Sequence, residues 1–217
     1  MDSLAAFLPI DRRYALAADQ PLPDRVNGAV LFADISGFTP LTAVLAKELG
    51  PHRGAEELSR QLNRVFTELI AAVHRYGGSV ITFSGDAITC WFDNSLSSDH
   101  TPADLALACG LTMQQAMADM ADIKTPNGTQ ISLALKVAIA TGPARRFLVG
   151  NPDMQAMEVL AGETLDHMAD AESTANKGEI VLTSDTLKSL TTSPLIREQR
   201  TSVTGFHITI INTATPI

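Results

Sequence analysis

Two aspartates stand where the chain is expected to turn, and their positions make them the strongest candidates for chemistry. Asp34 follows the apolar run 29–33, which has the composition of a strand buried on both faces. Asp86 lies between the strand-like runs 79–83 and 87–92, at the expected tip of a hairpin. If these strands are neighbours, both carboxylates project at one edge of the sheet, where a divalent cation would relieve their repulsion. Oxygen ligands of this kind favour Mg²⁺ or Mn²⁺ over zinc.

The residues that follow Asp34 are candidates for binding phosphate. Ser36, Gly37, Phe38 and Thr39 stand at the start of an expected helix, where free backbone N–H groups point toward one place. A glycine there lets a ligand approach the backbone closely. A helix N-terminus beside a site for a hard metal suits a polyphosphate, so the pattern indicates phosphoryl or nucleotidyl transfer.

Each of these residues also has a purely structural interpretation. An aspartate after a strand is commonly a helix N-cap, and a Gly-Asp pair is commonly only a turn. Both interpretations stay open for Asp34 and Asp86 taken singly, whereas their pairing next to Gly37 favours a binding site.

The elements that must position these residues alternate between helix and strand. Apolar periodicity predicts helices after Asp34 to about 49, over 54–76, over 102–120 and over 163–174, and a clean alternating strand over 131–139. Shorter strands are expected near 146–149, 157–160, 179–182 and 206–211. This order predicts an α+β fold, ferredoxin-like, with a central sheet. We expect residues 1–27 to form an N-terminal arm and residues 28–217 the domain.

Composition narrows the range of partners. The chain has 217 residues, of which 45% are apolar, and 16 basic against 24 acidic residues give a net charge of -8. An acidic surface is a poor partner for nucleic acid or anionic lipid. No apolar run approaches the ~20 residues that span a bilayer, and the N-terminus lacks a signal pattern. We therefore expect a cytoplasmic protein that binds neither nucleic acid nor membrane.

Several motifs resemble those of the class III adenylate and guanylate cyclase catalytic domain, a nucleotidyl cyclase. They are Leu-Phe-Ala-Asp-Ile-Ser-Gly-Phe-Thr at 31–39, Tyr-Gly-Gly at 76–78, Phe-Ser-Gly-Asp-Ala at 83–87, Ala-Thr-Gly-Pro at 140–143, Gly-Glu-Thr-Leu-Asp at 162–166 and Gly-Glu-Ile-Val at 178–181. The chain is most similar to the first cyclase half of soluble, bicarbonate-responsive-type adenylyl cyclases and of bacterial multidomain relatives.

This resemblance implies a ferredoxin-like cyclase fold with a mostly antiparallel sheet flanked by helices, and roles for Asp34, Ile35, residues 36–39 and Asp86. Asp34 and Asp86 would be the two metal-binding aspartates, and the Ile35 carbonyl would be a further ligand. The amides of residues 36–39 would hold the β- and γ-phosphates of ATP, with GTP as the alternative. Two Mg²⁺ or Mn²⁺ ions per active site would assist conversion to 3′,5′-cyclic AMP and pyrophosphate.

The chain departs from the family pattern in the complementary set of residues. By the resemblance, Thr82 and Val159 stand where the family has its base-binding lysine and polar residue, and Asp166 and Asp170 stand where it has the asparagine and arginine that stabilise the transition state. An acid in place of the family's arginine would repel developing phosphate charge. We therefore expect a half that works with a complementary cyclase half or, weakly or not at all, as a homodimer. The alternative is a catalytically silent module that binds a nucleotide or ligand and mediates dimerisation.

Overall fold

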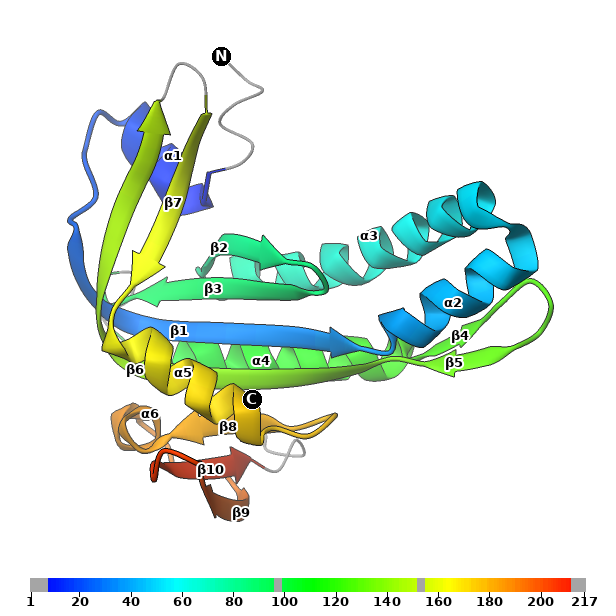
Figure 1. The fold of residues 1–217 in the computed structure, drawn as a ribbon. Coiled ribbons are helices and arrows are strands. Elements are labelled where there is room, and N and C mark those ends of the chain that lie inside the picture. The colour runs from blue at the N-terminus through cyan, green and yellow to red at the C-terminus, as the bar shows by residue number, and fades with distance from the viewer. Residues whose placement is uncertain (1–7, 96–98, 152–154, 212–217) are drawn as a thin grey trace.

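The computed structural model describes residues 8–95, 99–151 and 155–211. Within these ranges one sheet of eight strands crosses the molecule, in the order β2-β3-β1-β6-β8-β10-β9, with β7 paired to β6 (Figure 1). The strands are β1 (Arg25–Ser36), β2 (Ser79–Ser84), β3 (Ala87–Asp93), β6 (Ala134–Asn151), β7 (Gln155–Ala161), β8 (Ile180–Thr183), β9 (Ile196–Thr201) and β10 (His207–Ile211). Every pairing is antiparallel except that of β6 with β8.

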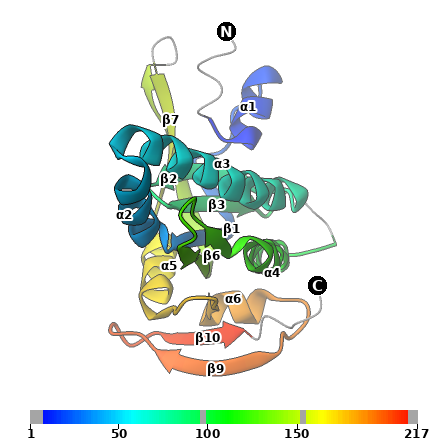
Figure 2. The ribbon, with the colours of Figure 1, turned by 90° about the vertical axis from the view of Figure 1, so that its right-hand side faces the viewer.

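Helices cover both faces of the sheet. They are α1 (Ile10–Ala17), α2 (Phe38–Leu49), α3 (Pro51–Arg75), α4 (Pro102–Met120), α5 (Glu163–Thr174) and α6 (Ser184–Ser189), and a separate pair of strands, β4 (Asp122–Lys124) and β5 (Gln130–Ser132), lies beside them. Residues such as Leu31 and Leu69 build the core under α2, α3 and α4. Val30 and Met168 belong to a second core under α5. Figure 2 shows α4 and α5 on opposite sides of the central strands.

The predicted fold class is confirmed: the chain is α+β, with a mostly antiparallel central sheet flanked by helices. The helix expected from residue 54 begins at Pro51, because proline suits the first helical position, where its missing N–H has no intrahelical partner. The prediction that 1–27 forms an arm and 28–217 the domain remains a prediction; residues 1–7 and 212–217 lie outside the described part of the chain.

The predicted strand over 131–139 is corrected. Residues 130–132 pair with β4, and a single strand of 18 residues then runs from Ala134 to Asn151, absorbing the short strand expected near 146–149. The strand passes through Pro143, although proline cannot donate to a sheet ladder. On one edge of β6 the pairing with β8 ends at Ile139 and the pairing with β7 begins at Arg145. Pro143 is tolerated because it lies in the gap between these two pairings.

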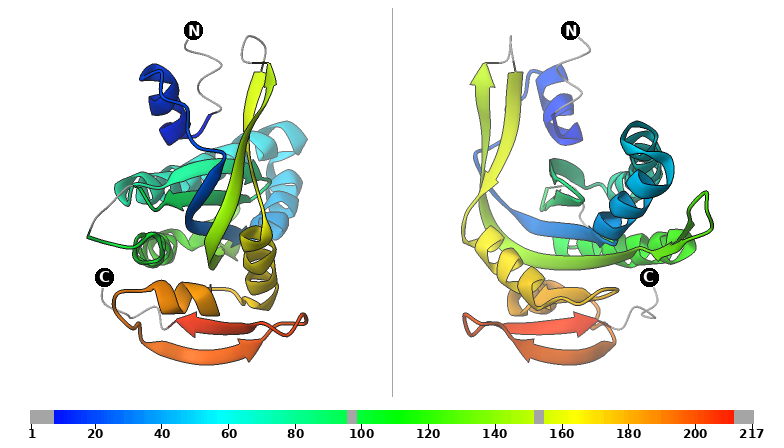
Figure 3. Two further views of the ribbon diagram at one scale, coloured as in Figure 1. Left: turned by 90° about the vertical axis from the view of Figure 1, so that its left-hand side faces the viewer. Right: turned by 45° about the vertical axis from the view of Figure 1, so that its right-hand side comes forward.

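Beyond the body of the sheet, β6 and β7 continue as a hairpin with α1 beside it (Figures 1 and 3). Four charged side chains join the two elements. Glu158 accepts hydrogen bonds from Arg12 Nε at 2.7 Å and from Arg146 Nε at 2.7 Å, and Arg146 also donates to Asp11 at 2.5 Å. The side chains of Glu158 and Arg146 are almost fully buried. This charged cluster (Asp11, Arg12, Arg146 and Glu158) fixes α1 to one face of the hairpin.

Candidate active site

The structure brings the two predicted aspartates to the same end of neighbouring strands. Asp34 stands opposite Ala87 in the pairing of β1 with β3, so Asp86 is one residue from that position. The N–H of Ile35 donates to the carbonyl oxygen of Asp86 at 3.1 Å, which ties the hairpin turn to the end of β1. Both aspartates are partly exposed to solvent. The backbones of Asp34 and Asp86 therefore lie side by side just before the start of α2.

Ile35 and Gly37 shape the backbone around these aspartates. In a strand the N–H and C=O of one residue point to the same side, so the Ile35 carbonyl faces the turn that holds Asp86. Gly37, the N-cap of α2, has a φ of 110°. A Cβ at Gly37 would lie 2.7 Å from the carbonyl oxygen of Ser132, so both the backbone conformation and the space require glycine.

The start of α2 offers backbone rather than side-chain groups. No side chain caps this helix, so the first amides, those of Phe38 and Thr39, remain available to a ligand. The next residue, Pro40, has no N–H. The Phe38 ring lies in the core, and the Ser36 hydroxyl donates to the Ala134 carbonyl at 3.2 Å. Of the segment 36–39, Phe38 and Thr39 thus carry the amides at the uncapped helix start, and phosphate binding by this segment stays a prediction.

Two further residues belong to the site, and the sequence reasoning missed both. Lys136 on β6 stands opposite Asp34, and its Nζ lies 3.2 Å from Asp34 Oδ2. The same Nζ donates to Glu172 Oε1, on α5, at 2.5 Å. Burial disfavours the charge of Lys136, but its hydrogen bonds with Glu172 and Asp34 outweigh this and raise its pKa. The signal was a lysine on a face of the central strand that otherwise carries only alanine and glycine from residue 134 to residue 144.

The donor set fits a hard divalent cation. The described residues contain no group of three or more His, Cys, Asp or Glu side chains placed to hold a metal. What they do provide is two carboxylates and one backbone carbonyl, all oxygen donors, which suit Mg²⁺ or Mn²⁺. Because Mg²⁺ usually binds through one or two carboxylates together with phosphates and water, oxygens of water or phosphate would complete this set of ligands.

The positions that depart from the family pattern lie apart from this set. Thr82 is exposed on β2, and Val159 is on β7 opposite Phe147. Asp166 is exposed on α5. Asp170, one turn further along α5, accepts a hydrogen bond from the hydroxyl of Thr204 at 2.5 Å. Asp170 therefore has an intrachain role, which is to hold the turn between β9 and β10 against α5.

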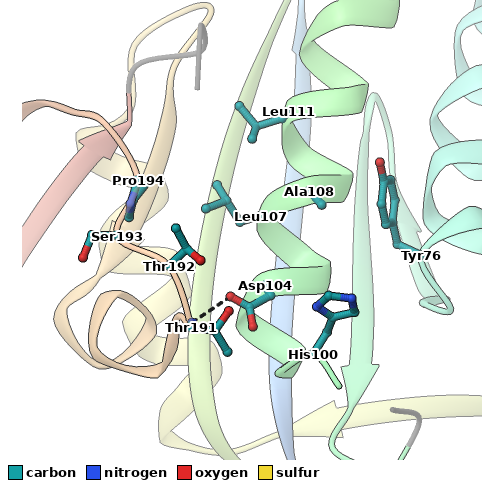
Figure 4. A pocket seen from close by; sticks show the side chains of 10 residues that line it. All are labelled: Tyr76, His100, Asp104, Leu107, Ala108, Leu111, Thr191, Thr192, Ser193 and Pro194. Atoms are coloured by element: carbon teal, nitrogen blue, oxygen red, sulfur yellow. Dashed lines mark hydrogen bonds between the residues drawn. The ribbon is translucent and has the colours of Figure 1, made fainter. Parts of the chain in front are cut away.

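One cavity lies away from the aspartates. It has a volume of about 480 Å³ between α4 and the segment 191–194, and its lining includes Tyr76, His100 and Leu111 (Figure 4). Asp104, which also lines it, already accepts from the Thr191 amide at 2.9 Å and forms the capping box of α4. Because neither Asp34 nor Asp86 lines this cavity, we do not assign the chemistry to it.

Comparison with known proteins identifies the family to which the chain belongs. The sequence model of the adenylate and guanylate cyclase catalytic domain matches residues 23–210. Together with the fold, this match shows that the chain belongs to the class III nucleotidyl cyclase catalytic domain family. The described part of the chain contains no helix that is both long and apolar enough to cross a membrane.

Particular relatives include both adenylyl and guanylyl cyclases. The chain is 24% identical over 181 residues to adenylate cyclase type 10 of Homo sapiens, covering 82% of this chain and 11% of that protein. It thus spans about a tenth of the length of this relative. The adenylyl cyclase CyaB from P. aeruginosa has a TM-score of 0.70 at 23% identity, covering 87% of this chain and 94% of that one. The guanylyl cyclase Cya2 has a TM-score of 0.70 at 25% identity, covering 87% and 92%.

Proposed function

We propose that this chain is the metal-binding half of a class III adenylate cyclase that converts ATP to 3′,5′-cyclic AMP and pyrophosphate at an interface with a complementary half. The observation that carries this proposal is the juxtaposition of Asp34 and Asp86 beside the uncapped start of α2. The resemblance to adenylate cyclase type 10 supports ATP over GTP.

Each residue of the site has a defined part in this reaction. Asp34, Asp86 and the Ile35 carbonyl would hold two Mg²⁺ or Mn²⁺ ions. When bound, such ions stabilise charge on the phosphates and lower the pKa of the ribose 3′-hydroxyl. The amides of Phe38 and Thr39 would bind the β- and γ-phosphates.

Lys136 adds a cation to this arrangement. Its flexible stem carries three N–H donors, which would reach phosphate oxygens on the same side of the sheet as Asp34. In the reaction the 3′-oxygen loses its proton and bonds to the α-phosphorus, while the bond from that phosphorus to the departing pyrophosphate breaks. The residues of this chain orient the triphosphate for that in-line displacement.

A complementary half would supply what this chain lacks. Thr82 and Val159 replace the lysine and the polar residue with which the family binds the base, and the carboxylates of Asp166 and Asp170 would repel a developing anion. The β6–β7 hairpin exposes the apolar side chains of Phe147, Val149 and Met157, and such a patch supports contact with a second domain.

The test is to assay the chain with ATP and Mn²⁺, alone and mixed with a cyclase half that carries the lysine, asparagine and arginine of the family pattern. We expect cyclic AMP and pyrophosphate in equal amounts, and much more of both after mixing. Asp34→Asn in the mixture should lower the rate roughly a hundredfold or more. Glu163→Gln, which removes an exposed carboxylate from α5, is the matched control and should leave the rate unchanged. No gain on mixing, together with a fully active D34N mixture, would refute the proposal.

Lys136 also favours a second candidate, the catalytically silent module. A cation already paired with Asp34 stabilises that carboxylate without any metal. Calorimetry with ATP and Mg²⁺ separates the two: binding without turnover in any mixture supports the silent module, and turnover excludes it.

A further inference from the structure

Lys136 is shared between two carboxylates on different elements. Its Nζ lies 3.2 Å from Asp34 on β1 and 2.5 Å from Glu172 on α5. All three side chains are about three-quarters buried, so solvent screens their charges less than it would at the open surface. The ammonium group is therefore placed between a candidate metal ligand and a carboxylate from another element.

A divalent cation and Lys136 compete for Asp34. Like charges in a partly buried site repel strongly, so a metal ion on Asp34 requires the ammonium group to move away. A lysine moves readily because its charge sits at the end of a flexible stem. Without a second anion nearby, the ammonium group that leaves Asp34 would have no partner in a partly desolvated site, which is energetically unfavourable.

We propose that Glu172 is a positioning residue that draws Lys136 off Asp34 and so frees that carboxylate for a divalent cation. The proposal rests on the proposed function, in which Asp34 is a metal ligand. In this arrangement α5 sets the metal affinity of a site built on β1 and the β2–β3 turn, although Glu172 is not itself a ligand.

A simpler role for Glu172 is to add negative charge near the site. The two roles differ in their dependence on Lys136. A positioning role disappears when the lysine is removed, whereas a direct attraction between Glu172 and the metal remains. Non-additivity in a double-mutant cycle therefore separates them.

The experiment measures Mn²⁺ binding to the full chain by electron paramagnetic resonance of the free ion, at fixed low ionic strength, without nucleotide. The variants are Glu172→Gln, Lys136→Met and the double variant, with circular dichroism to verify that each is folded. Glu163→Gln is the matched control, because it removes a charge from the same helix at a side chain that is 79% exposed. Asp34→Asn reports whether Asp34 binds the ion at all.

We expect E172Q to weaken Mn²⁺ binding by about tenfold and K136M to tighten it several-fold. The double variant should bind within about twofold of K136M, and E163Q within about twofold of wild type. Equal weakening by E172Q with and without Lys136 would overturn the positioning role, as would weaker binding by K136M.

The failure of this proposal differs from that of the proposed function. Loss of Mn²⁺ binding in D34N together with unchanged binding in E172Q refutes the role of Glu172 alone. Binding by D34N as tight as wild type, or no binding by wild type, refutes the metal-ligand role of Asp34 and with it both proposals.

Discussion

Neutralising Glu158 is the sharpest test of the charged cluster that joins α1 to the β6–β7 hairpin. The Glu158 side chain is fully buried and accepts three hydrogen bonds, two from Arg12 at 2.7 and 2.9 Å and one from Arg146 at 2.7 Å. Glu158→Gln keeps the shape of the side chain but leaves two guanidinium groups with one fewer anion. Breaking a buried ion pair from one side costs about 3–5 kcal/mol.

We expect the lower end of that range, about 3 kcal/mol, because the glutamine carbonyl still accepts one bond and Arg146 keeps Asp11. Equilibrium urea unfolding followed by circular dichroism measures this loss. With an m-value of about 2 kcal/mol/M, the midpoint should fall by about 1.5 M. Arg12→Ala should cost less, about 1–2 kcal/mol, because the buried Glu158 carboxylate then still keeps its ion pair with Arg146.

Glu163→Gln on the surface of α5 serves as the control and should change the free energy of unfolding by less than about 0.5 kcal/mol. If E158Q loses less than about 1 kcal/mol, the buried charges are more hydrated than the geometry implies, and the reasoning is wrong.

Three further predictions follow from other parts of the molecule. Burial opposes ionisation of Glu179, but two arginines and a backbone amide outweigh this effect and lower its pKa from 4.5 to about 2. The ionised Glu179 therefore stabilises the folded chain above pH 4.5, and this stabilisation is lost as the pH falls toward 2. Acid unfolding should show wild type losing about 3 kcal/mol more than E179Q across that range. Gly37→Ala should lower the free energy of unfolding, measured by thermal unfolding, by about 2 kcal/mol, because φ at Gly37 is 110° and the new Cβ would contact backbone atoms. Gly85→Ala should lower it by about half as much, because φ at Gly85 is 66° but no atom lies within 4 Å of the new Cβ. Burial raises the thiol pKa of Cys90 and Cys109, so an aromatic disulfide reagent should label neither until the chain unfolds; rapid labelling of the native protein would contradict their burial.

Much of the fold could be predicted from the sequence because its signals are local. The apolar run before Asp34 and the helical periodicity of α3 and α4 specify their elements without tertiary information. Strand β9 could not be predicted, because almost all of its residues are exposed and it lacks an alternating pattern. The continuity of β6 through Pro143 depends on the neighbouring strands that pair with it, and the local sequence of one strand does not specify its neighbours.

Some residues of the candidate site could be predicted from the sequence and others could not. Asp34, Asp86 and Gly37 could be found because each stands at a turn that the sequence marks. Glu172 could not, since nothing in α5 indicates that this carboxylate reaches a lysine on β6, 36 residues away along the chain. The bond from Thr204 to Asp170 is likewise a long-range contact, so the structural use of that aspartate emerges only once β9 and β10 are folded against α5.

Helix α1 belongs to the folded unit but lies outside the region that matches the cyclase family. The match to the cyclase domain begins at residue 23, whereas Arg12 and Asp11 complete the ionic contacts of Arg146 and Glu158 inside the matched region. A chain trimmed to the matched residues would expose the inner face of its own hairpin to water. Its solubility and association would then reflect the truncation, so experiments on a minimal catalytic fragment should begin upstream of Pro9.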